Sequence, residues 1–241
     1  MGDFERALKF TLKREGGYVN DADDHGGETN FGITVATFNE AIKEGLVPEK
    51  SKNIKELTND DVRKIYKELY WNKIHGDSLP NDLSIAVFDF AVNSYHVQSA
   101  ITLQKILKVK ADGKIGPNTV KAIKLYEGNL VEAYLDAREA FFREIAKKPK
   151  QAKFLKGWLN RNDDLRKYIN PGYVKKDKKL PALAVPKPST DKKKVNKKAE
   201  NGLKHPHAAE ASAWHQKDHY NTKRWNIASR LYSLHRFLWE D

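Results

Sequence analysis

The sequence predicts a mainly α-helical protein, and three observations support this prediction. Apolar residues recur three or four positions apart in most segments between residues 4 and 170, which places them on one face of a helix. Signals for the start of a helix precede several of these segments. One segment, Leu83 to Val92, is apolar nearly all round, as is typical of a helix buried at the centre of a protein.

The first predicted helix leads into a glycine-rich loop. Phe4, Leu8 and Leu12 share one helical face, and Gly16-Gly17 follow directly after Glu15. Because glycine is unfavourable inside helices and permissive elsewhere, the helix should end there. The sequence therefore places Glu15 in the last helical turn.

Two N-cap signals mark the next helices. Thr34 is placed to cap a helix over residues 33–43. Thr58, followed by acidic residues, is placed to cap a helix that runs from Val62 to Tyr70 or beyond. The residues expected to face inward from the first of these helices are Val35, Phe38 and Ala41.

The predicted central helix carries two polar residues, Asp89 and Asn93, one turn apart. Buried polar groups need hydrogen-bond partners or a function. Two interpretations are therefore open: the pair ties neighbouring helices together, or it lines a binding cleft.

The chain continues as helices over residues 100–107, 120–126 and 130–146. Asp112-Gly113 and Gly116-Pro117 are turn signals, and Pro117 is placed where a helix can begin. The third helix has a stripe that is most simply core, made of Leu130, Ala133, Tyr134, Ala137, Phe141 and Ile145.

The last 71 residues differ in composition from the rest. Residues 171–241 hold 16 Lys and Arg against 7 Asp and Glu, whereas residues 1–170 hold 28 against 25. Residues 175–198 contain ten lysines and three prolines and cannot bury a core, so we expect an extended linker. Beyond it, residues 208–214 and 222–239 look helical, and the second segment has an apolar face.

Glu15 has the setting of a general acid. A carboxylate in the last turn of a helix meets the negative end of the helix dipole. This should raise its pKa, as a general acid requires. The loop that follows holds four glycines and four acidic residues, and it closes on Thr29 and Thr34.

A carboxylate on a rigid helix, facing a second carboxylate and a hydroxyl on a shaped loop, suits glycoside hydrolysis. A solvated acidic turn is the plainer alternative. A calcium loop is less favoured, because the sequence lacks the EF-hand spacing.

The same stretch, Glu15-Gly-Gly-Tyr-Val-Asn-Asp21 with Gly26-Gly-Glu-Thr-Asn-Phe-Gly-Ile-Thr34, resembles the signature of glycoside hydrolase family 108. The resemblance runs from about Phe4 to about Ile169. It implies a lysozyme-like helical fold with an irregular active-site loop, and an N-acetylmuramidase activity on peptidoglycan strands. It implies no cofactor.

The resemblance also implies roles for site residues. Glu15 matches the catalytic glutamate, Asp24 lies nine positions later and Thr29 five after that. We assign Asp24 to positioning water or stabilising the cation, and Thr29 to holding that water. Other residues stay open for these two roles: Asp21, Asp23 and Glu28 for Asp24, and Thr34 for Thr29.

Four residues are predicted to bind substrate: Tyr18, Asn30, Asp89 and Asn93. The last two lie in Phe88-Asp-Phe-Ala-Val-Asn-Ser94, which resembles an element of the same family. Tyr95 then stands where that family usually has glycine.

A second resemblance concerns residues 112–119, Asp-Gly-Lys-Ile-Gly-Pro-Asn-Thr. Flanked by helices, this element resembles small peptidoglycan-binding modules, and a helix–loop–helix turn without a ligand is the alternative. A Gly157-Trp158-Leu-Asn-Arg161 run resembles the end of the family's fold. The predicted organisation is a lysozyme-like catalytic region at 1–92, a peptidoglycan-binding-like region at 93–170, a Lys/Pro-rich linker at 171–204 and an amphipathic tail at 205–241.

The basic tail is expected to attract an anionic membrane, lipopolysaccharide or a protein partner. Specific nucleic-acid binding is not expected, because the lysines are clustered with prolines and are not interleaved with aromatic residues. No metal site is predicted, since His215 and His219 have no third ligand placed by spacing.

The start of the sequence has no apolar signal-peptide region. We therefore expect synthesis in the cytoplasm and action on the cell wall in the periplasm after release, or carriage in a virion. The rival function is a non-catalytic wall-binding or scaffold protein on a lysozyme-like fold.

Overall fold

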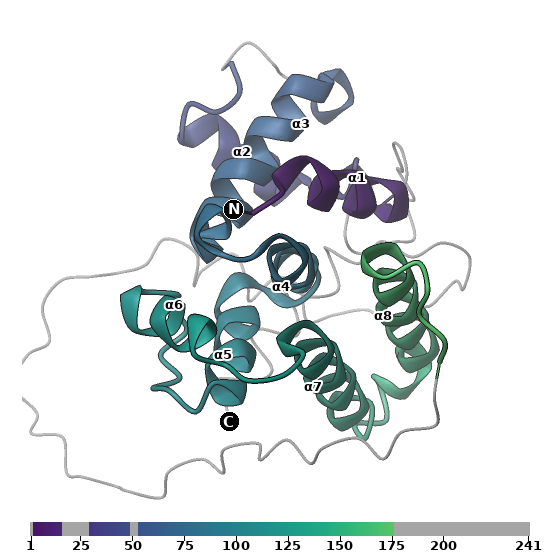
Figure 1. The fold of residues 1–241 in the computed structure, drawn as a ribbon. Helices are drawn as coiled ribbons and strands as arrows, with labels where there is room; N and C mark the ends of the chain where they lie inside the picture. Colours follow the sequence, from purple (N-terminus) through teal and green to yellow (C-terminus); the bar gives the residue numbers. More distant parts are fainter. Residues whose placement is uncertain (1, 16–28, 49–52, 176–241) are drawn as a thin grey trace, which may run out of the picture.

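The computed structural model describes residues 2–15, 29–48 and 53–175, and this part of the chain is mainly helical, as the sequence predicts (Figure 1). The α-helices are α1 (Phe4–Glu15), α2 (Val35–Lys43), α3 (Asn59–Tyr66), α4 (Asn81–Ser94), α5 (His96–Ile106), α6 (Pro117–Lys124), α7 (Leu130–Ile145) and α8 (Leu155–Ile169). The shorter elements are η1 (Ile54–Glu56), the π-helix η2 (Lys67–Trp71), η3 (Asn72–Ile74), η4 (Gly76–Ser78), η5 (Ala152–Phe154), β1 (Thr29–Asn30) and β2 (Ile33–Thr34). Within the described ranges, no helix is long and apolar enough to cross a membrane.

Helix α4 is the centre of the fold. Every residue from Leu83 to Ser94 is buried, which confirms the prediction of a buried central helix. Helices α1, α5, α7 and α8 all pack against it (Figure 1). Side chains on α4 can therefore contact several helices that are far apart in the sequence.

Helix α1 lies across α4 through its apolar face. Phe4, Ala7, Leu8 and Phe10 are buried on that face. The Phe4 ring meets Phe88 of α4 edge-on, with the ring centroids 6.0 Å apart. Helix α1 ends at Glu15, as predicted from the glycines that follow it.

The predicted helix starts agree with the structure in three places. Thr34 caps α2 by accepting a hydrogen bond from the Thr37 backbone N–H. Thr58 caps α3 in a capping box with Asp61, and Pro117 occupies the first turn of α6. The two threonine caps satisfy backbone donors that have no partner within the helix, and proline suits a first turn because it has no such donor.

One detail of the α2 prediction is wrong. The helix begins at Val35 because Ile33 and Thr34 form strand β2. Val35, expected to face inward, is 39% exposed. The two-residue strand shifts the start of the helix and so turns its first residue outward.

A short hairpin leads into α2. Strands β1 and β2 pair antiparallel, with Thr29 opposite Thr34 and Asn30 opposite Ile33. The two residues between them, Phe31 and Gly32, have φ values of 51° and 75°. Positive φ at both central residues is what a tight type I′ hairpin turn requires.

The regions predicted at 1–92 and 93–170 share one hydrophobic core. That core runs from Phe4 in α1 through α4 to Leu165 in α8. The predicted linker and tail lie outside the described residues, except for residues 171–175. Because α4 touches helices of both regions, groups from the two can meet at one site.

Candidate active site

The Glu15 side chain lies at the end of α1 and is only 2% exposed. Its Oε1 accepts a hydrogen bond from Arg161 Nη1 of α8 at 2.8 Å. Its Oε2 is also buried and has no hydrogen-bond partner among the described residues. The two oxygens of this carboxyl group therefore have different surroundings.

The surroundings of Glu15 act on its pKa in opposite directions. Burial raises the pKa and is the largest effect, while the charge and hydrogen bond of Arg161 lower it. The nearby Asp89 carboxylate raises it further, and the net direction is upward. This is the direction expected from the sequence, but desolvation rather than the helix end is the main cause.

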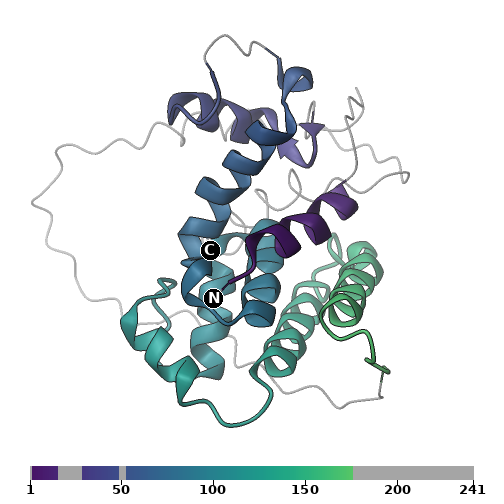
Figure 2. The same ribbon diagram turned by 45° about the horizontal axis from the view of Figure 1, so that its top comes forward.

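The β1–β2 hairpin turn packs directly against Glu15. A Cβ atom placed on Gly32 would lie 2.7 Å from both Cβ and Cγ of Glu15 and 3.0 Å from its Oε2. Only glycine allows this approach, and its φ of 75° also favours glycine. Figure 2 shows the strands near the C-terminal end of α1.

This hairpin carries two of the predicted site residues, Thr29 and Asn30. Both are buried, at 1% and 4% exposure. Asn30 Nδ2 donates to the Ile54 carbonyl of η1 at 2.9 Å, which anchors the hairpin. Tyr66 of α3 anchors it from another side, because its hydroxyl donates to the Phe31 carbonyl at 2.9 Å.

Asp89 is fully buried and bound by two arginines. Arg161 contacts both of its oxygens through Nε at 3.1 Å and Oδ1 through Nη2 at 2.7 Å. Arg138 Nη2 of α7 reaches Oδ2 at 2.7 Å. Burial alone would raise the pKa of Asp89, but the two guanidiniums lower it. The observed contacts tie α4, α7 and α8 together, and a contact between Asp89 and substrate stays a prediction.

Asn93, one turn further along α4, is also completely buried. Its Oδ1 accepts a weak hydrogen bond from Ser94 Oγ at 3.4 Å. Its amide nitrogen has no partner in the described part of the chain. An unpaired buried donor calls for an explanation, and the predicted role of Asn93 in substrate binding remains open.

The other predicted site residues, Tyr18 and Asp24, lie outside the described residues, as do Asp21, Asp23, Glu28 and the histidines of the tail. Among the residues that are described, no cluster of His, Cys, Asp or Glu could hold a metal ion. The structure thus brings together Glu15 and the hairpin of Thr29 and Asn30.

Sequence reasoning missed the role of two arginines. Arg161 enters the family resemblance only as the end of the Gly157-Trp158 run, and Arg138 belongs to no motif. Both are at most 4% exposed. The available signal was the position of Arg138 within an apolar helical stripe. A charged residue is almost never buried unless it is paired, so this position indicates a buried ion pair.

The predicted wall-binding turn at residues 112–119 is closed by internal contacts. Gln104 of α5 accepts from the Gly113 N–H at 2.9 Å and donates to Asp112 Oδ1 at 2.9 Å. These bonds hold the turn between α5 and α6. Polar groups of the turn therefore have hydrogen-bond partners within the fold, and ligand binding by this turn stays a prediction.

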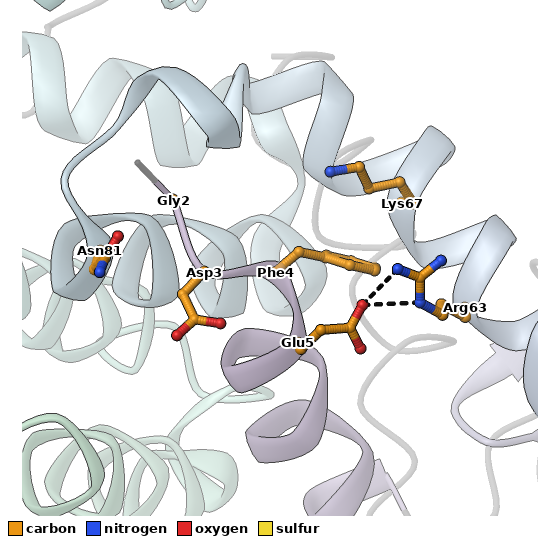
Figure 3. A pocket seen from close by; sticks show the side chains of 7 residues that line it. All are labelled: Gly2, Asp3, Phe4, Glu5, Arg63, Lys67 and Asn81. Carbon is orange, nitrogen blue, oxygen red and sulfur yellow. Dashed lines mark hydrogen bonds and ion pairs between the residues drawn. The ribbon is translucent and has the colours of Figure 1, made fainter.

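A pocket of about 430 Å³ lies at the other end of α1. Figure 3 shows Arg63 hydrogen-bonded to Glu5 at its rim, with Nε 2.8 Å from Oε1. Lys67 pairs with Asp77 at 3.1 Å. The cations at this pocket already have carboxylate partners, and the pocket is separate from Glu15. Its lining residues are Gly2, Asp3, Phe4, Glu5, Arg63, Lys67 and Asn81.

The fold and the site together define a mainly helical protein whose buried carboxyl group suits the acid chemistry of a glycosidase. The sequence model of the family described as "Glycosyl hydrolase 108" matches residues 8–94, and that of the "Predicted Peptidoglycan domain" matches residues 98–163.

Among solved structures, that of SagA from Brucella abortus is similar to this chain, with 35% sequence identity and a TM-score of 0.58. The match covers 69% of this chain and 92% of that chain. None of the curated proteins matches. The chain belongs to glycoside hydrolase family 108, and it is a peptidoglycan hydrolase of the glycosidase class.

Proposed function

We propose that this protein is an N-acetylmuramidase, a lysozyme that cleaves the β-1,4 bond between N-acetylmuramic acid and N-acetylglucosamine in peptidoglycan. Glu15 is the general acid in this proposal. The observation that carries it is the asymmetric setting of the buried Glu15 carboxyl, with Oε1 held by Arg161 and Oε2 without a described partner. Burial raises the pKa of this group, which favours the protonated form that a general acid needs to donate to a leaving oxygen.

The proposed reaction begins with transfer of the proton from Glu15 Oε2 to the glycosidic oxygen. The bond between that oxygen and the anomeric carbon breaks, and the sugar gains oxocarbenium character. Glu15 becomes a carboxylate, which the Arg161 guanidinium 2.8 Å away stabilises. In this proposal Asp24 positions the attacking water or stabilises the cation, and Thr29 helps to hold the water.

Digestion of purified peptidoglycan, followed by mass spectrometry of the fragments, tests this proposal. Wild type should create new reducing ends at N-acetylmuramic acid. Glu15→Gln should lose about 10²- to 10⁴-fold in rate, the usual contribution of a general acid. Glu44→Gln is the matched control, because Glu44 is exposed just beyond α2. A Glu15→Gln rate within about tenfold of wild type would contradict the assignment.

The same digestion with Asp24→Asn, beside Asp21→Asn and Asp23→Asn, tests the second carboxylate. Asp24→Asn should be the most damaging of the three. If it is the mildest, another aspartate in the loop has the role.

The match of residues 98–163 to a peptidoglycan domain supports a second candidate function, a wall-binding or scaffold protein without catalysis. Sedimentation with purified cell walls separates the two functions. A wild-type protein that sediments with the wall but releases no reducing ends would favour the scaffold. Cleaved peptides with intact glycan strands would instead indicate an amidase-like activity.

A further inference from the structure

Four buried side chains of alternating charge form a chain across the centre of the fold. Glu15 of α1 pairs with Arg161 of α8, Arg161 pairs with Asp89 of α4, and Asp89 pairs with Arg138 of α7. The joining N–O distances are 2.8, 2.7 and 2.7 Å, and every side chain is at most 4% exposed. The carboxyl group proposed to donate the proton is therefore one end of a larger network.

The network divides the Arg161 guanidinium unequally. Its Nε and Nη2 are directed to Asp89, and only Nη1 reaches Glu15. The donors of a guanidinium have a fixed, planar arrangement. Because Asp89 occupies the Nε and Nη2 edge, that edge cannot also bind the Glu15 carboxylate through two parallel hydrogen bonds. Glu15 consequently receives one hydrogen bond, on Oε1, while Oε2 receives none from the described residues.

Arg138 fixes the position of Asp89 from the opposite side. Within the described part of the chain its one hydrogen bond goes from Nη2 to Asp89 Oδ2, and its Nε and Nη1 are buried without a partner there. The guanidinium lies over the rings of Phe90 and Phe142, 5.2 and 5.4 Å from their centroids. Arg138 thus helps to compensate the buried charge of Asp89, so that Arg161 can contact both Asp89 and Glu15.

We propose that Asp89 is a positioning residue for Glu15: by holding Arg161 through Nε and Nη2, it restricts Arg161 to one hydrogen bond on Glu15 and keeps Oε2 available for the transferred proton. This inference rests on the proposed role of Glu15 as the general acid. Asp89 acts through Arg161 and need not touch the substrate.

The groups that face Glu15 from the elements packed around it set its pKa. Arg161 and Asp89 are the charged ones among the described residues that shift its pKa. Tyr66 and Tyr70 also lie near, but burial raises the pKa of both, that of Tyr70 to about 12, so they stay neutral. The adjacent Arg14 is paired with Asp164 at 2.6 Å.

The sign of the expected change follows from these charges. Asp89→Asn removes a carboxylate that raises the pKa of Glu15 and leaves the attraction of Arg161 unopposed. The pKa of Glu15 should fall. A general acid must be protonated to act. As the pH is raised, the activity of Asp89→Asn should therefore decline at a lower pH than the activity of wild type.

The experiment is the pH profile of kcat/KM on purified peptidoglycan for wild type, Asp89→Asn and Asp136→Asn. Asp136 of α7 is the matched control, because it pairs with the buried Arg166 of α8 at 2.6 Å and leaves Glu15 untouched. In Asp89→Asn, the ratio of the rate at about pH 8 to that at about pH 5 should fall several-fold. Asp136→Asn should keep the wild-type ratio.

A structural role alone would lower the amount of folded enzyme without moving the profile. An unchanged profile in Asp89→Asn, or an equal shift in Asp136→Asn, would overturn the inference. If Asp89→Asn does not fold, the charge-balanced Asp89→Asn/Arg138→Met protein replaces it, since removing both partners of a buried pair is tolerated better than removing one. The same shift is expected, and its absence there counts equally against the inference.

Carbon NMR titration of the Glu15 carboxyl, assigned with Glu15→Gln, reads the group directly in the same proteins. Wild type that cleaves no glycan would refute the proposed function. A Glu15 titration that Asp89→Asn leaves unchanged would refute the inference about Asp89, whether or not the enzyme is active.

Discussion

At the scale of single residues, the site depends on what surrounds a side chain more than on its type. Glu15 and Asp89 are both buried carboxyl groups that contact Arg161. The pKa of Glu15 is raised, because burial outweighs one hydrogen bond from arginine. The pKa of Asp89 is lowered, because two guanidiniums overcome the effect of burial. Two carboxyl groups with opposite shifts suit an acid and its supporting ion pair.

Tyr95 shows backbone strain at a single position. It joins α4 to α5 with φ 77° and ψ 142°, a region that residues other than glycine rarely adopt. Its side chain is 43% exposed, and its ring lies 4.1 Å from that of His96. The family resemblance places glycine here, which agrees with the observed φ.

Tyr95→Gly should therefore stabilise the fold, by about 1 kcal/mol. Relief of the strain is worth roughly 1–3 kcal/mol, and the greater freedom of glycine in the unfolded chain offsets about 0.5–1 kcal/mol of that gain. Urea denaturation measures the difference. Tyr95→Ala is the matched control, since it loses the ring but keeps a Cβ at positive φ. If glycine proves no more stable than alanine, the strain is not significant.

At the scale of elements, the β1–β2 hairpin shapes the surroundings of Glu15. Its Phe31-Gly32 turn is anchored by Tyr66, and its Asn30 is anchored on η1. The turn packs on Glu15 where a Cβ would not fit. The hairpin is thus one wall of the candidate site.

Gly32→Ala should lower both stability and activity. The new Cβ would lie 2.7 Å from Glu15 carbons at a φ of 75°, so the hairpin or the carboxyl group must move. We expect a loss of about 1–3 kcal/mol in unfolding free energy and at least about tenfold in the rate of glycan cleavage.

Gly45→Ala is the matched control for this variant. Gly45 has a φ of 71° and nothing within 4 Å of the added Cβ, so it should lose stability but keep its activity per folded molecule. Equal activity of folded Gly32→Ala and Gly45→Ala would show that the close contact with Glu15 does not matter.

At the scale of the whole molecule, the two regions matched by separate family models meet at one site. Glu15 lies within residues 8–94 and Arg161 within residues 98–163. Helix α4 belongs to the first of these regions, packs against helices of both, and contributes Asp89 to the joining ion pairs. The C-terminal region therefore contributes directly to the surroundings of Glu15 in addition to any part in wall binding.

The charge of the molecule is concentrated beyond this body. Residues 176–241 hold 15 Lys and Arg against 7 Asp and Glu. Lys175 is a suitable end for a shortened chain, because it still contacts Asp163 of α8 at 2.5 Å. A chain that ends at Lys175 should cleave purified glycan within about threefold of the full chain, but lose salt-sensitive binding to anionic lipid vesicles. Rates and vesicle sedimentation at low and high salt measure both. Vesicle binding that survives the truncation would place the basic surface on the body instead.

Much of the helical fold could be predicted because its signals are local. The Thr34 and Thr58 caps, the first turn at Pro117 and the end of α1 at Glu15 each depend on residues within one helical turn. The burial of α4 could be predicted because eight of the ten residues from Leu83 to Val92 are apolar, and a helix that is apolar nearly all round needs burial on all sides. The hairpin was missed because two-residue strands are too short to show an alternating pattern.

The sequence by itself determined the helices, the family resemblance and the identity of Glu15 as the candidate acid. Only the tertiary structure decided what that carboxyl group contacts. Arg161 is 146 positions from Glu15 and 72 from Asp89, and no local pattern links residues so far apart. Their pairing follows from the packing of α1, α7 and α8 around α4, which brings the charges together and excludes the water that would otherwise screen them.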